Sequence, residues 1–131
     1  MRYNRKNAVN YARGHALCTS LYESGRDADA TAFVSRCIAA GFGLDFECRD
    51  PDLLCDTLQN SLSAHECGIS ELQAGDVVQV RSRDSLPYKS LIVTEKTNED
   101  ILVAAHSYIS LDRQLSSYRV CDMRCIRIGL C

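Results

Sequence analysis

The eight cysteines have the widest chemical range in this chain, because a thiolate can attack a carbonyl, bind a metal or form a disulfide. No C-x-x-C pair occurs, and the closest two, Cys121 and Cys125, are four residues apart in a region expected to be a strand. This spacing does not fit a zinc site, so we expect no metal and no other cofactor. No apolar stretch follows the basic start of the chain, as a secretion signal would require. We therefore expect mostly reduced, buried thiols, with Cys131 the most labile, and one or more disulfides as the alternative.

One cysteine has a histidine close by in the sequence. His65 and Cys67 are two residues apart and have the side-chain types of a catalytic dyad. A dyad needs thiol and imidazole to meet in space, and proximity along the chain does not supply that geometry. We do not assign the pair a catalytic role.

Length and composition set the frame into which any site must fit. The chain has 131 residues, 46% hydrophobic and 24% charged, with a net charge of −2. This is enough for one domain, residues 1–131, that buries about two thirds of its unfolded surface. No basic stripe favours nucleic acid as a partner, and no apolar run is long enough to span a membrane. We expect a cytoplasmic protein, or an exported one if the sequence is cut from a longer chain.

Hydrophobic periodicity predicts helices in the first half of the chain and strands in the second. Helical spacing covers residues 4–17 and 30–40, the latter with Asp29 as N-cap and Gly41 at its end. Asp50 followed by Pro51 predicts the start of a third helix. Strand patterns cover residues 76–82, 88–95, 101–106 and part of 118–128. This order predicts an α+β domain with N-terminal helices packed on an antiparallel sheet.

Five short segments carry a more specific pattern: residues 3–12 (YNRKNAVNYA), 29–36 (DATAFVSR), 72–78 (LQAGDVV), 89–94 (KSLIVT) and 103–107 (VAAHS). They resemble, in the same order, Y-N-R-x-x-A-V-x-Y-A, D-C-T-N-F-V-S-Q, L-x-x-G-D-[VL]-[VI], H-S-A-I-V-T and A-x-H-[ST] of the papain-like amidase domain family. That family is related to NlpC-type peptidases and CHAP amidases. The resemblance spans nearly the whole chain. It implies a papain-like fold, in which a cysteine at the start of a helix packs against an antiparallel sheet that carries a histidine.

The resemblance assigns three site positions: Ala30 to the nucleophile, Lys89 to the base and His106 to the group that orients the base. It implies that Ala30 lies in the first turn of a helix and that Lys89 and His106 face it from the sheet. In such a site the helix N-terminus and an imidazole lower the thiol pKa, and the third group fixes the imidazole. Alanine has no nucleophilic atom, and a lysine with a reference pKa of about 10.4 is protonated at neutral pH. Losing a nucleophile typically costs about a million-fold in turnover, so we expect the chain as written to be inactive. The two departures together favour a naturally degenerate site over an engineered substitution.

Two classes of function remain open at this stage. The first is an amidase or cysteine-peptidase-like domain acting on amide or peptide bonds, inactive because of Ala30, or an amide-forming relative with the same substitution. The second is a non-catalytic binding module whose cleft holds a peptide or amide-containing ligand, such as a cell-wall fragment, or a partner protein.

Three neighbouring residues have simpler interpretations. Thr31 is expected to use its hydroxyl on the first turn of its helix rather than as a nucleophile. Cys37, two turns further along, is expected to be a packing thiol. Asp76, after Gly75, is expected to be a turn residue at the start of a strand.

Overall fold

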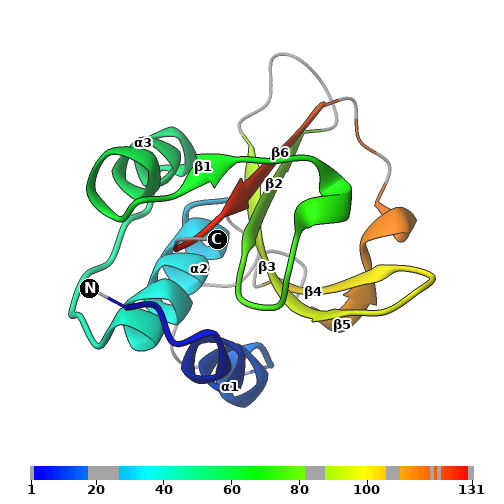
Figure 1. Ribbon diagram of the computed structural model, residues 1–131, viewed down its shortest axis with the longest axis horizontal. Helices are drawn as coiled ribbons and strands as arrows, with labels where there is room; N and C mark the ends of the chain where they lie inside the picture. The colour runs from blue at the N-terminus through cyan, green and yellow to red at the C-terminus, as the bar shows by residue number, and fades with distance from the viewer. Residues whose placement is uncertain are drawn as a thin grey trace.

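The α+β class predicted from the sequence is confirmed. The computed structural model describes residues 2–17, 27–81, 88–105, 110–118, 120 and 122–129, and within them it has three α-helices and a six-stranded antiparallel sheet. The helices are α1 (Arg5–His15), α2 (Asp27–Phe42) and α3 (Pro51–Ser61). Figure 1 shows them gathered on one side of the sheet, where α2 contacts β3 and β4, while α1 and α3 pack against α2.

Side-chain capping explains where two of the helices begin. The Asn4 side chain accepts a hydrogen bond from the Asn7 amide (3.0 Å) at the start of α1. The Asp50 carboxylate accepts from the backbone amide of Asp52 (2.9 Å), and Pro51 occupies the first helical position, as predicted.

The boundaries of α2 differ from the prediction at both ends. The helix begins at Asp27, so Asp29 is a helical residue and not its N-cap. The helix also continues through Gly41 to Phe42, and Gly43, at φ +69°, follows its end. Gly41 has a different role, because a Cβ atom at this position would overlap the ring of Tyr3. Close packing of the N-terminal segment, rather than helix termination, requires this glycine.

The strand order β1-β6-β2-β3-β4-β5 brings the last strand back beside the second. Two strands were missed by the sequence analysis: β1 contains only two residues, and β5 carries no alternating apolar pattern. The six strands are β1 (His65–Glu66), β2 (Val77–Arg81), β3 (Lys89–Lys96), β4 (Ile101–Ala105), β5 (Ser110–Gln114) and β6 (Asp122–Arg127).

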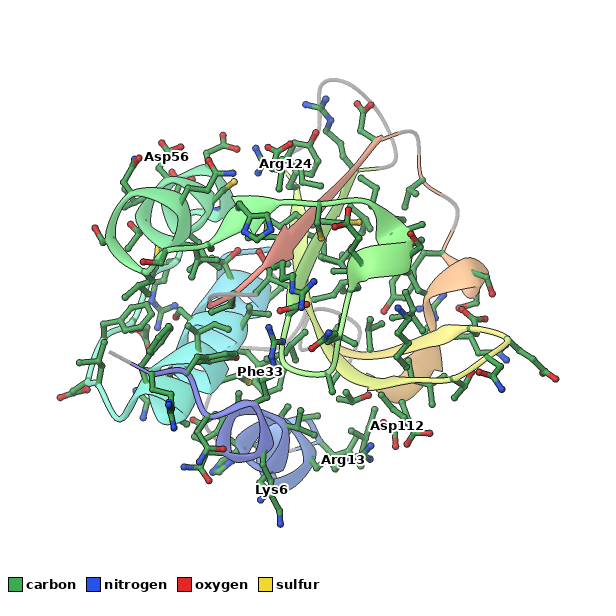
Figure 2. The ribbon with its side chains drawn as sticks, viewed as in Figure 1. Lys6, Arg13, Phe33, Asp56, Asp112 and Arg124 are labelled. Carbon is green, nitrogen blue, oxygen red and sulfur yellow. The ribbon has the colours of Figure 1, made fainter. Side chains whose placement is uncertain are left out.

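Each face of the sheet has its own apolar core, as strand alternation requires. On the helix side, Ile92, Ala104 and Ile126 pack with Phe33 of α2, which Figure 2 shows between α2 and the sheet. On the opposite face, alternate residues of the same strands pack together with Leu72 and Leu115 from the connecting segments: Val78, Leu91, Val93, Val103 and Cys125. The side chains of β3 therefore alternate between the two faces from Lys89 to Val93, where the pairing with β4 shifts register.

A buried ion pair fixes the first helix to the sheet. Asp76 is fully buried and accepts from Arg5 Nη1 (2.6 Å) and from the backbone amides of Gln73 (2.8 Å) and Ile128 (3.0 Å). Arg5 also donates to the carbonyl oxygen of Ile128 (2.5 Å). The expectation that Asp76 is only a turn residue is therefore too narrow, because its carboxylate joins α1, the start of β2 and the end of β6.

A second ion pair joins α1 to the far edge of the sheet. Arg13 Nη1 lies 2.5 Å from Asp112 Oδ2 on β5, and Figure 2 shows the two side chains next to each other. Thr94 of β3 donates to the other carboxylate oxygen of Asp112 (2.6 Å). These contacts connect α1 to β5 and β3.

Candidate functional site

Ala30 lies where the amidase resemblance predicts, in the first turn of the helix that packs on the sheet. It is the fourth residue of α2, and none of its surface is exposed to solvent. Its methyl group offers no atom for nucleophilic attack and no proton to exchange. A side chain so enclosed is also poorly placed to meet a substrate.

Thr31, the next residue, makes the contact between the start of α2 and the sheet. Its hydroxyl lies 3.0 Å from the Ser90 hydroxyl of β3, and both side chains are fully buried. The hydroxyl therefore reaches across to the sheet, and its expected bond to its own helix turn stays a prediction. Ser90 in turn accepts from Gln79 Nε2 of β2 (3.1 Å), which also donates to the carbonyl oxygen of Pro51 (2.8 Å). This polar chain links α2, β3, β2 and α3.

The expectation that Lys89 faces Ala30 is wrong. Ser90 is paired with Gln79 and Lys89 with Val80 in an unbroken antiparallel register. Since Ser90 contacts α2, Lys89 projects from the other face of the sheet, together with Leu91 and Val80. The residue of this pair that faces the helix is therefore Ser90 and not Lys89.

His106, the predicted orienting residue, lies outside the described residues. The structure therefore leaves its role as a prediction. Among the described histidines, His65 is exposed on β1, and the His15 ring stacks on Tyr11 of α1 at a centroid distance of 3.9 Å.

Sequence analysis missed the polar groups that continue from Gln79 toward the end of the sheet. Arg124 of β6 is the cross-strand partner of Gln79, and its Nη2 lies 2.9 Å from Asp52 Oδ1 at the start of α3 (Figure 2). The guanidinium carbon of Arg124 also lies 3.8 Å from the centre of the Tyr88 ring, a cation–π contact. Strand alternation would put Gln79 and Arg124 on the same face as Ser90 once the strand pairing is known. The pairing of β6 with β2 is not visible in the sequence.

Two buried polar atoms in this region have no hydrogen-bond partner: Oε1 of Gln79 and Nε of Arg124. One is an acceptor and the other a donor, and they come from directly paired residues. Buried polar atoms are normally satisfied, and leaving one unpaired costs about 1–3 kcal/mol.

The described thiols do not replace the missing nucleophile. Five described cysteines are not in disulfides: Cys37, Cys48, Cys55, Cys67 and Cys125. Cys37 is fully buried in the helix-side core, as expected of a packing thiol, and this burial raises its pKa well above the ordinary value. The prediction for Cys131 falls outside the described residues.

The described side chains of this site offer hydrogen-bonding groups. Two hydroxyls and an amide, those of Thr31, Ser90 and Gln79, are joined by hydrogen bonds. Over the described part of the chain, no group of three or more His, Cys, Asp or Glu side chains could hold a metal ion. No helix in the same residues is long and apolar enough to cross a membrane.

Comparison with known proteins adds no relative to this description. No protein-family model, no curated protein and no solved structure matches the chain.

Proposed function

We propose that this chain is an amidase-like domain of papain-like architecture that does not cleave amide bonds and instead binds a peptide or another amide-containing ligand. The observation that carries the proposal is the contact at the start of α2. Where the amidase resemblance requires a thiol and an imidazole, a fully buried alanine lies beside a threonine that hydrogen-bonds to Ser90.

The helix-on-sheet arrangement supports the papain-like part of the proposal. The helix that carries position 30 packs on β3, which begins at Lys89, and on β4, which ends at Ala105, one residue before His106 in the sequence. The hydroxyls of Thr31 and Ser90 are hydrogen-bonded to each other and to the Gln79 amide, which cannot act as a general base and remove their proton at neutral pH.

The unpartnered atoms of Gln79 and Arg124 support the binding part of the proposal. Because Gln79 is fully buried, a ligand amide reaches its Oε1 atom only when the surrounding side chains move aside. An amide that then donates to Gln79 Oε1 and accepts from Arg124 Nε would satisfy both atoms at once. The partial burial of Arg124, its pairing with Asp52 and its stacking on Tyr88 hold the guanidinium in place before a ligand arrives. A preorganised donor loses less entropy on binding.

The binding experiment is a titration of the ¹⁵N-labelled protein with a mixture of blocked dipeptide amides, followed by backbone and side-chain amide resonances. We expect shifts centred on Thr31, Gln79 and Arg124. The Gln79→Met variant removes the unpaired acceptor and should weaken binding about tenfold, the value of roughly one hydrogen bond. Gln114→Met, at an exposed position of β5, is the matched control and should bind like the wild type. Shifts confined to another surface, or none with any peptide, would contradict the proposal.

A further inference from the structure

A pair of thiols lies on the sheet face opposite α2, away from the candidate site. Cys67 directly follows β1, and Cys125 lies in β6. Both pack in the apolar cluster formed by Val78, Leu91 and Val93. The pair therefore shares one face and one environment, and it takes no part in the proposed function.

The strand register places the two residues directly opposite each other. His65 pairs with Arg127 and Glu66 with Ile126, so the next pair in the ladder is Cys67 with Cys125. The backbone amide of Cys67 donates to the carbonyl oxygen of Cys125 (2.9 Å), which continues the pairing one residue beyond β1.

The geometry of such a pair is close to that of a disulfide. Hydrogen-bonded antiparallel partners have Cα atoms about 5.5 Å apart, inside the range of about 4.4–6.8 Å found across disulfides. Hydrogen-bonded partners lie at the long end of the cross-strand Cβ range, about 5.5 Å, compared with about 3.5–4.5 Å in a disulfide, so closing the bond requires an approach of about 1–2 Å. Because β1 is a two-residue edge strand, its end can move by that amount without disturbing the central strands.

We propose that Cys67 and Cys125 are a reversible redox site that closes into a cross-strand disulfide when a disulfide oxidant such as oxidised glutathione is present. Cys67 is only partly buried, while Cys125 is buried, so Cys67 reacts first. Its thiolate attacks one sulfur of the oxidant, forms a mixed disulfide and releases one glutathione thiolate. The Cys125 thiolate then attacks the Cys67 sulfur and releases the second. The two protons lost by the cysteines are taken up by the two glutathione molecules, so two electrons pass from the protein to the oxidant.

The electrostatic surroundings set the order of these steps. Burial, together with the nearby Cys67 and Glu66, raises the pKa of Cys125 to about 11. A thiol with so high a pKa is a poor first nucleophile at neutral pH. Once Cys67 is in the mixed disulfide it no longer carries a charge, and its contribution to the Cys125 pKa is removed.

The test is a redox titration of the full chain in native buffer, with increasing ratios of oxidised to reduced glutathione. After acid quenching and alkylation of the remaining thiols, peptide mapping by mass spectrometry identifies each linkage. We expect a linked pair of peptides containing Cys67 and Cys125, present in a fraction that rises with the oxidised ratio. Persistence of both residues as alkylated thiols, or linkage of Cys67 to a different cysteine, would overturn the proposal.

Two variants sharpen the result without replacing the wild-type measurement. In Cys125→Ser the reaction should stop at glutathionylated Cys67, because the second thiol is missing. Cys48→Ser, which changes a partly buried thiol near the start of α3, should leave the Cys67–Cys125 linkage unchanged. A disulfide between Cys67 and another cysteine of the chain in Cys125→Ser would count against the pair.

Discussion

The Thr31 hydroxyl lies 3.0 Å from the Ser90 hydroxyl, and neither side chain reaches solvent. This contact defines which residues of β3 face α2, because the side chains of a strand alternate between its two sides. The helix-facing set is therefore Ser90, Ile92 and Thr94, and Lys89 belongs to the other set.

Disulfide trapping can test this register directly. In Thr31→Cys with Ser90→Cys, the two sulfur atoms replace hydroxyls that are already in contact, so mild oxidation should link them in most molecules. Thr31→Cys with Lys89→Cys is the matched control and should give no linkage between the two new cysteines. Peptide mapping separates these products from links to the native thiols. Trapping at residue 89 in preference to residue 90 would show that the register is wrong.

The ion pair between Arg5 and Asp76 should dominate the stability of the N-terminal half. Asp76→Ala leaves the Arg5 guanidinium without its carboxylate and two backbone amides without their acceptor. Breaking such a buried pair typically costs about 3–5 kcal/mol in the free energy of unfolding, measured here by urea denaturation. Asp52→Ala, which removes an exposed partner of Arg124, should cost about 1 kcal/mol or less. Equal losses in the two variants would contradict the structural role of Asp76.

Two helical glycines should respond in opposite directions to alanine. At Gly41 the added Cβ would overlap the Tyr3 ring, so Gly41→Ala should destabilise the protein by about 1–3 kcal/mol. At Gly14, in the last turn of α1, nothing lies within 4 Å of the new Cβ, and the substitution should stabilise by about 0.5–1 kcal/mol. Thermal denaturation of both variants measures the two shifts. A stabilising Gly41→Ala would show that Tyr3 does not pack on α2 as described.

Stability should fall in alkaline solution, in part because of Cys125. Burial raises the pKa of this thiol to about 11 in the folded protein, whereas an unfolded cysteine has a pKa of about 8.5. Between these values the unfolded chain has lost the proton that the folded chain keeps, so the free energy of unfolding decreases as pH rises. Under reducing conditions, Cys125→Ala should show a shallower decline from pH 8 to pH 10 than the wild type.

Val78→Ala is the control for this pH series. Val78 is the cross-strand neighbour of Cys125 and packs in the same cluster, but it does not titrate. Its substitution should lower stability at every pH and leave the slope unchanged. A slope in Cys125→Ala identical to that of the wild type would remove Cys125 from the explanation.

The sequence predicted those features that depend on local pattern. Asp50 and Pro51 are adjacent and cap α3 as expected, and the alternating residues of β3 form a strand. Features that depend on long-range packing were not predictable. Gly41 was interpreted as a helix end because its partner, Tyr3, lies far away in the chain. The sequence also could not show that Ser90, and not Lys89, faces α2. Only the packed helix shows which side of the strand it covers.

The register of β3 also predicts where a histidine must be placed to face a cysteine at position 30. In Ala30→Cys with Ser90→His the imidazole would start from the helix-facing side of β3, whereas in Ala30→Cys with Lys89→His it would start from the opposite side. Turnover divided by the Michaelis constant should therefore rise more in the first variant than in the second. Equal or greater recovery with Lys89→His would support the position that the motif alone suggests.

The proposed function requires a site that binds amides without cleaving them, and one experiment measures both binding and cleavage. The wild-type protein, in molar excess, is mixed with the mixture of blocked dipeptide amides, and NMR spectra are recorded over many hours. We predict that the resonances of Thr31, Gln79 and Arg124 shift on mixing while the substrate signals stay intact at the rate of the protein-free control. Steady growth of hydrolysis products above that control would contradict the account and show that the chain is an active amidase.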